Sequence, residues 1–76
     1  MNKDFYKLLG KNIKKYRKKS KLTQQEFADR LNISLNFVGK IEVAFSKPSL
    51  DMLIKIADGL GITVSELCNF SKFDKN

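Results

Sequence analysis

The feature that most constrains this fold is a tight turn between two segments whose sequences are typical of helices. Thr23 stands three residues before Glu26, which is the spacing of a capping box at the start of a helix. Asn32 follows that segment, and asparagine tolerates the left-handed conformation in which many helices end. Ser34 then offers its hydroxyl as the N-cap of a second helix at about 34–43. The sequence therefore predicts two short helices joined by a turn of about three residues.

A longer helix is expected before this pair. Phe5, Leu9, Ile13 and Tyr16 recur at intervals of three and four residues, so they lie on one face of a helix. This spacing predicts about four helical turns that end near Lys19.

Two further helices are expected after the pair. Pro48 disfavours helix at the residue before it, and Ser49 follows as an N-cap. Gly61 ends this fourth helix, and Thr63 and Glu66 have the spacing of a second capping box, which starts a short fifth helix. The apolar stripe predicted for the fourth helix consists of Leu50, Leu53, Ile56, Ala57 and Leu60.

These patterns predict an all-α fold, a compact arrangement of five helices in which the second and third form a helix-turn-helix. The 76 residues are enough for one domain over 1–76, with a core at 5–70 and a polar tail at 71–76. No apolar run is long enough to span a membrane, and the N-terminus lacks the apolar stretch of a signal peptide. We therefore expect a cytoplasmic protein.

Positive charge is concentrated near the N-terminus. The chain carries a net charge of +7, and nine of its fifteen basic residues lie at 3–21 beside one acid, Asp4. This pattern indicates a surface for a polyanion such as nucleic acid. A solvated helix face explains it equally well, and a membrane surface is a third possibility that the apolar residues, needed for a core, disfavour.

Catalytic and metal-binding classes are poorly supported. The chain has no histidine, which removes the commonest general base, and a single cysteine, Cys68. Cys68 excludes an intramolecular disulfide, and it is interpreted as a small buried hydrophobe, with an intermolecular or redox role as the alternative. We expect no metal site, no cofactor and no enzymatic activity.

Four motifs in this order resemble those of lambda-repressor and Cro-like (XRE-type) helix-turn-helix transcriptional regulators, over residues 9–67. They are "LGKNIKKYRKK", "LTQQEFADRLNIS", "KIE" and "KPSLDMLIKIADGLGITVSEL". The resemblance implies a sequence-specific regulator of double-stranded DNA whose third helix contacts the major groove. It implies no small-molecule ligand, because no separate ligand domain is present.

The resemblance also assigns roles to individual positions. Arg17 and Glu42 match an ion pair between the first and third helices, for which we expect a buried, hydrogen-bonded pair rather than an exposed one. The positions expected to contact phosphates are Thr23, Gln24, Ser34 and Lys47. The positions expected to contact bases are Leu35, Asn36, Phe37 and Lys40.

The sequence departs from the usual family pattern at four positions. Lys21 and Ala44 occupy places where the family often has glycine, so a left-handed turn at Ala44 would be strained. Val43 and Phe45 replace residues that are commonly polar or basic. Together they create an apolar patch beside the third helix.

The third helix has one face for the core and one for a partner. At about 100° per residue, Val38 and Ile41 point to the core, whereas Asn36 and Lys40 point outward. Asn36 suits adenine, and Lys40 suits guanine or phosphate.

Leu35 and Phe37 flank the outer face of the third helix. They suit thymine methyls, which suggests a site rich in A·T steps. Both could instead pack within the domain. Gly39 indicates close approach to DNA or another helix, or else drift at an exposed site.

The leading interpretation is a repressor or controller that binds a palindromic operator as a homodimer. The predicted dimer contacts are Val64, Leu67, Cys68, Phe70 and Phe73. In the rival interpretation, Phe70 and Phe73 fold back onto the first helix near Phe5 and Tyr16, and the chain is monomeric. The alternative function is a protein-interaction or antitoxin-like module that uses Leu35, Phe37, Val43 and Phe45.

Overall fold

The computed structural model describes residues 2–72, and residues 1 and 73–76, Phe73 among them, lie outside that range. The helices are α1 (Asn2–Lys19), α2 (Gln24–Leu31), α3 (Leu35–Glu42), α4 (Leu50–Leu60) and α5 (Val64–Leu67), followed by the 3-10 turn η1 (Phe70–Lys72). Residues 2–72 contain no strand. The predicted all-α fold of five helices is confirmed, although α1 starts closer to the N-terminus than its apolar stripe indicated.

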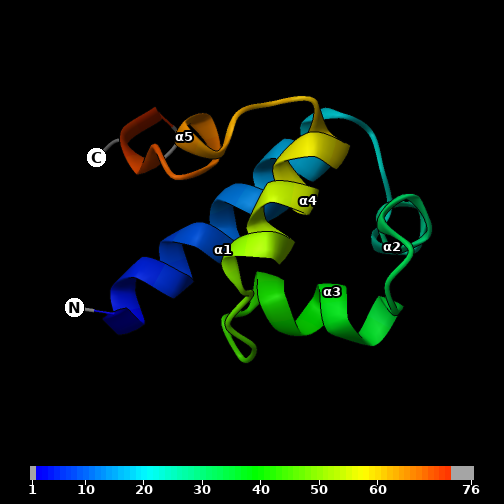
Figure 1. Cartoon of the computed structure of the whole chain (residues 1–76), viewed down its shortest axis with the longest axis horizontal. Helices are drawn as coiled ribbons and strands as arrows, with labels where there is room; N and C mark the ends of the chain where they lie inside the picture. The colour runs from blue at the N-terminus through cyan, green and yellow to red at the C-terminus, as the bar shows by residue number, and fades with distance from the viewer. Residues whose placement is uncertain (1, 73–76) are drawn as a thin grey trace.

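Most of the helices pack against α1, the longest helix, which runs diagonally from the N-terminus into the molecule (Figure 1). α1 contacts α3, α4, α5 and η1, and α2 packs against α3 and α4. α3 and α5 lie on opposite sides of α1 and α4, with α5 beside the C-terminus (Figure 1). The helix-turn-helix of α2 and α3 is therefore held by the rest of the domain from one side only.

The helix starts follow the predicted caps. Thr23 and Thr63 form capping boxes with the glutamates three residues later, and Ser34 and Ser49 accept hydrogen bonds from the backbones of α3 and α4. Each cap satisfies a backbone N–H group that the helix itself cannot. All four predicted N-caps are confirmed.

Four helices end in the same way. After α1, α2, α3 and α4 one residue adopts a left-handed conformation, and the next N–H donates back across the last turn. The left-handed residues are Lys21 (φ 60°), Asn32 (φ 57°), Ala44 (φ 64°) and Gly61 (φ 72°). Only one of them is glycine, so Lys21 and Ala44 carry a strain that glycine would avoid.

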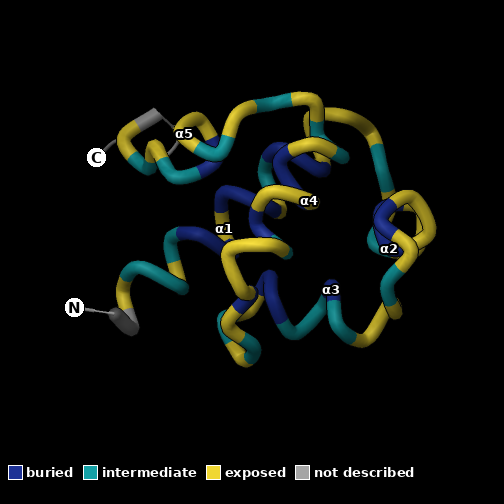
Figure 2. Tube along the Cα trace, in the orientation of Figure 1, coloured by how far each residue is buried: buried dark blue, intermediate teal, exposed yellow. Residues whose placement is uncertain are grey.

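The core forms where α1 meets the other helices (Figure 2). Its fully buried large side chains are Leu9, Ile13, Phe27, Val38, Ile56 and Leu67. The predicted stripe of α4 is wrong at Leu50, which is 66% exposed. Leu50 lies at the edge of the stripe centred on Leu53, Ile56 and Ala57, because helical residues advance by about 100°.

Two polar or small residues of α1 set how closely its neighbours approach. Asn12 is buried and its Nδ2 donates to the carbonyl oxygen of Leu67 at 2.8 Å, which ties α1 to the end of α5. A Cβ atom on Gly10 would lie 2.6 Å from the carbonyl oxygen of Glu42. The end of α3 therefore packs against bare backbone of α1, and only glycine fits there.

Candidate nucleic-acid interface

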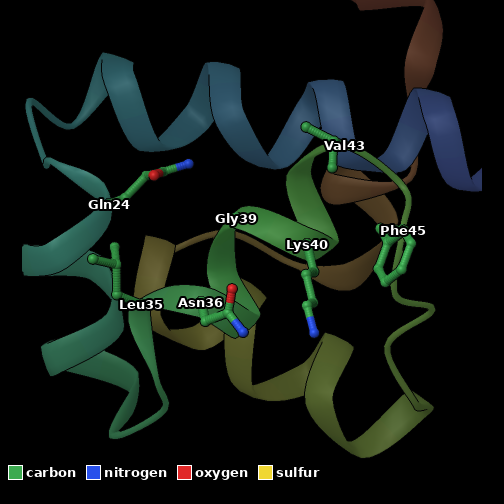
Figure 3. A pocket seen from close by; sticks show the side chains of 7 residues that line it. All are labelled: Gln24, Leu35, Asn36, Gly39, Lys40, Val43 and Phe45. Carbon is green, nitrogen blue, oxygen red and sulfur yellow. The ribbon is translucent and has the colours of Figure 1, made fainter.

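The outer face of α3 borders an open depression of about 540 Å³ (Figure 3). It is lined by Gln24, Leu35, Asn36, Gly39, Lys40, Val43 and Phe45. Leu35 and Phe45 lie at opposite ends, with Gly39 between them (Figure 3). Three of the four residues predicted to contact bases, Leu35, Asn36 and Lys40, thus border one surface.

Phe37 departs from the prediction. It does not line the depression, and it packs partly buried against the core. Leu35 shows the reverse, since it is exposed rather than packed on its own domain. The two flanking residues therefore differ in packing, with Leu35 exposed and Phe37 partly buried.

Gly39 is the floor of the depression. A Cβ atom built there meets no other atom within 4 Å, apart from the helix's own backbone. Packing within the chain therefore gives no reason for a glycine here, in contrast to Gly10. A group that packs closely on Gly39 must therefore come from outside residues 2–72.

The inner face of α3 is fixed by a buried ion pair. The Nε of Arg17 lies 2.6 Å from Oε2 of Glu42, and both residues are buried. A second guanidinium nitrogen of Arg17 donates to Oε1 of Glu42 at 3.1 Å, which makes the contact bidentate. The geometry is that of the buried pair and not of the exposed alternative.

The same pair organises the start of α2. The third guanidinium nitrogen of Arg17 donates to the carbonyl oxygen of Leu22 at 2.7 Å, in the turn before α2. The Nε2 of Gln24 donates to Oε1 of Glu42 at 3.0 Å. The side chain of Gln24 is thus held between α2 and α3, which the motif had not indicated.

The residues predicted to contact phosphates surround α3. Thr23 and Ser34 are exposed, and each hydroxyl oxygen accepts a backbone hydrogen bond at a helix start. A hydroxyl that accepts in this way keeps its own hydrogen as a donor. Lys47 is exposed in the loop after α3, and its Nζ lies 5.5 Å from the ring centroid of Tyr6.

The turn after α3 presents apolar side chains to solvent. Ala44 adopts the left-handed conformation that was expected to be strained for a residue other than glycine, and Val43 and Phe45 on either side are 74% and 76% exposed. The N–H of Phe45 donates to the carbonyl oxygen of Lys40 at 2.8 Å. The Nζ of Lys40 in turn lies 5.5 Å from the Phe45 ring centroid. The apolar patch predicted from the sequence is therefore attached to the polar face of α3.

Exposed lysines form a stripe along α1. Their spacing of three and four residues places them on the side opposite the buried Leu9, Ile13 and Tyr16. The members of this stripe are Lys7, Lys11, Lys14 and Lys18.

The predicted dimer contacts are only partly available. Leu67 has no exposed surface, so its prediction as a dimer contact is wrong. Phe70 packs on α1, with its ring 5.5 Å from that of Phe5, as the rival interpretation required. Val64 and Cys68 are half-buried against the core. Phe73 lies outside the described residues.

A different apolar surface remains exposed on α4. Leu50 and Ile54 are 66% and 51% exposed and lie one turn apart. Ile54 borders a second hollow of about 360 Å³, lined also by Asp51, Lys55, Ala57, Asp58, Ile62 and Val64. The sequence patterns did not predict this surface, although Ile54 lies outside the apolar stripe predicted for the fourth helix.

Other chemical features are few. Burial raises the pKa of the Cys68 thiol, which lowers its thiolate fraction. Within residues 2–72 no three histidine, cysteine or acidic side chains gather as metal ligands would. None of the helices described is both long and apolar enough to cross a membrane.

Some residues that shape the site escaped sequence reasoning. Gly10 and Asn12 lie on the predicted first helix, but their roles depend on which backbone packs against them. Tyr6 could have been noticed as an aromatic at the edge of the apolar stripe. Its contact with Lys47 depends on the course of the loop after α3, which no motif specifies.

Comparison with known proteins places this geometry among DNA-binding regulators. A family model described as helix-turn-helix matches residues 13–67. The chain is 40% identical over 60 residues to the cryptic phage CTXphi transcriptional repressor RstR of Vibrio cholerae. That match covers 79% of this chain but 54% of RstR, so the chain spans about half the length of that relative.

A second relative has nearly the same length. The chain is 42% identical over 67 residues to the control protein C.MunI of a Mycoplasma species, covering 87% of this chain and 88% of that protein. Among solved structures, the clp gene regulator ClgR of C. glutamicum superposes with a TM-score of 0.84 at 19% identity. This match covers 90% of this chain and 87% of ClgR, and it shows a shared fold.

Proposed function

The chain belongs to the lambda-repressor-like, XRE-type helix-turn-helix family, and from that premise we propose that it is a sequence-specific regulator of transcription that binds double-stranded DNA. The observation that carries the proposal is the outer face of α3, where polar and apolar side chains border an open depression. An exposed helix of this size fits the major groove.

We assign base contacts to the side chains that point away from the core. The amide of Asn36 can form two hydrogen bonds with adenine, and the ammonium of Lys40 can donate to guanine or phosphate. Leu35 supplies an apolar contact for a thymine methyl. Phe37 leaves this group, because it packs against the core.

Phosphate contacts would hold α3 in the groove. The N-terminus of α2 directs backbone N–H groups outward beside Thr23 and Gln24, and Ser34 offers its hydroxyl at the start of α3. Lys47 adds a positive charge in the loop after α3. These contacts carry little sequence information, but they position the protein on the duplex.

Selection of bound duplexes from a random DNA pool tests this function. We expect enrichment of one palindromic sequence rich in A·T steps. Binding to it should weaken by orders of magnitude between low and high salt, because phosphate contacts release counterions. A pool in which no sequence competes better than random DNA at any salt concentration would contradict the proposal.

We further propose that the working unit is a two-fold symmetric homodimer. One short helix contacts only a few base pairs, and so short a site recurs too often for regulation. Two copies would place their α3 helices about 34–36 Å apart, one turn of DNA. The support for an interface lies in Leu50 and Ile54 of α4, with Val64 beside them.

Sedimentation equilibrium at micromolar concentration tests the dimer. We expect association of the wild-type protein, and its loss in the double variant Leu50→Ser with Ile54→Asp. As a control, Val43→Ser removes an even more exposed apolar side chain outside α4 and should leave association unchanged. A wild-type chain that is monomeric both free and on its selected DNA would exclude this unit.

The remaining expectations follow from the family. A regulator of this kind acts where DNA is, which in a bacterial cell is the cytoplasm. We propose no enzymatic activity, because the depression contains polar and apolar contacts but no catalytic group.

A further inference from the structure

The depression beside α3 has apolar walls that the proposed contacts of α3 do not use. Leu35 closes one end, and Phe45 and Val43 rise from the turn after α3 at the other (Figure 3). Clusters of exposed apolar side chains usually mark a binding surface. Phe45 and Val43 are 76% and 74% exposed, although the Nζ of Lys40 lies 5.5 Å from the Phe45 ring centroid.

The rest of the lining indicates the chemistry of the occupant. Gln24 and Asn36 provide amides, Lys40 provides a cation, and no acidic side chain lines the depression. The occupant should therefore carry negative charge, hydrogen-bonding edges and small apolar groups together. A strand of DNA that contains thymine has all three, because thymine presents a carbonyl oxygen and a 5-methyl group in the major groove.

The floor has room for such a group. The position of a Cβ on Gly39 has no neighbour within 4 Å, beyond the helix's own backbone. A methyl group that approaches α3 here meets bare backbone at Gly39, within the depression that Phe45 bounds at one end. The depression is thus open to a small apolar group where a larger residue at 39 would fill it.

The turn holds these walls in place despite its strain. Ala44 keeps its left-handed conformation (φ 64°), and its N–H donates to the carbonyl oxygen of Ile41 at 3.1 Å. The N–H of Phe45 donates to the carbonyl oxygen of Lys40. Strained backbone of this kind is often found at functional sites.

We propose that this depression receives thymine 5-methyl groups, and that Phe45 and Val43 are specificity-determining residues located beyond the recognition helix itself. The inference rests on the proposed DNA-binding function and deepens it. It assigns to the turn after α3 a direct part in distinguishing thymine from the other bases.

Replacement of single thymines by deoxyuridine tests the proposal. The wild-type protein is titrated with its selected duplex and with duplexes in which one thymine at a time is replaced, which removes the methyl group and keeps the hydrogen-bonding pattern. We expect at least one replacement to weaken binding by about fourfold, the effect of burying one methyl-sized group. That loss should disappear in Phe45→Ser or in Val43→Ser.

A conservative variant provides the matched control. Phe45→Leu keeps an apolar wall and should keep the deoxyuridine effect. Thermal unfolding of the serine variants should match the wild type, because both side chains are mostly exposed. If Phe45→Ser weakens all duplexes equally and the deoxyuridine effect persists, Phe45 acts only by positioning Lys40, and the proposal is overturned.

The remaining outcomes are also decisive. A selected duplex that shows no deoxyuridine effect with the wild-type protein overturns this inference and leaves DNA binding intact. The same holds if both serine variants bind every duplex as the wild type does, which would leave the patch to a protein partner. A pool without any enriched sequence overturns the proposed function and this inference with it.

Discussion

The two faces of α3 differ in what their side chains contact. On the inner face, Val38, Ile41 and Glu42 are buried, and Glu42 accepts hydrogen bonds from Arg17 and Gln24. On the outer face, Leu35 and Asn36 are exposed and border the depression. One helix of eight residues thus carries a face committed to the fold and a face available to a partner.

The two faces of α3 show how so small a domain can hold a binding surface rigid. The inner face is fixed by three kinds of contact: core packing, the buried ion pair, and the close approach of α3 to Gly10. The outer face then needs no stabilising contacts of its own. Substitutions on the two faces should therefore separate stability from binding.

The largest effect is expected on the inner face, from Glu42→Met. This change leaves the Arg17 guanidinium buried without its carboxylate, which costs about 3–5 kcal/mol in the free energy of unfolding. Urea unfolding followed by circular dichroism measures it. Asp29→Asn, at an exposed acid of α2, should change stability by less than about 0.5 kcal/mol.

A double-mutant cycle with Arg17→Met sharpens this prediction. The double variant should be much more stable than the sum of the two single losses implies, because no charge is left buried alone. Additive losses would mean that the pair is not coupled, and the inner face would then depend on apolar packing alone.

On the outer face, Asn36→Ala should reverse the pattern. Stability should change by less than about 0.5 kcal/mol, whereas binding to the selected duplex should weaken by about 1–3 kcal/mol at one or two base positions. Fluorescence anisotropy measures the binding to the selected and to random duplexes. Lys47→Ala provides the contrast, since it should weaken all sequences alike. Equal losses for Asn36→Ala on both duplexes would remove it from the base contacts.

Gly39→Ala should have opposite effects on folding stability and on DNA binding. Alanine favours a helix over glycine by about 1 kcal/mol, and the added methyl meets no atom of the chain, so the protein should become more stable. The same methyl should hinder DNA and weaken binding. Gly10→Ala is the matched control: its methyl would meet the carbonyl oxygen of Glu42, so stability should fall by about 1–3 kcal/mol. Unchanged DNA affinity in Gly39→Ala would mean that the outer face is not closely approached.

The smallest effect is expected at the turn that joins the two faces. Ala44→Gly should raise stability by up to about 1 kcal/mol, because glycine adopts the left-handed conformation without steric cost. The larger loss of backbone entropy that glycine suffers on folding offsets part of this gain. Thermal unfolding measures the change. Val43→Gly, one residue earlier and not left-handed, should show no gain. A loss of stability in Ala44→Gly would show that the turn is not strained.

Local features of this fold could be predicted from the sequence, because they depend on few neighbouring residues. Each N-cap involves a side chain and a backbone N–H group three residues away, so Thr23, Ser34, Ser49 and Thr63 were recognisable from spacing alone. The core face of α3 followed from its helical period.

Features that depend on packing between distant segments could not be predicted in this way. Leu67 and Leu50 have similar side chains, yet the first is fully buried and the second exposed, because burial depends on how α5 and α4 pack against α1. The hydrogen bond from Gln24 to Glu42 joins residues that no local rule pairs. The predicted dimer contact at Leu67 is wrong for this reason, because its side chain is buried in the core.

The left-handed Lys21 and Ala44 also bear on how this domain can change over generations. Each is one substitution to glycine away from a more relaxed helix end, without any change in core packing. Most substitutions destabilise a protein, and a domain of this size has little margin. A lineage that alters the outer face of α3 to recognise a new operator therefore has two stabilising substitutions within reach, at the helix ends after α1 and α3.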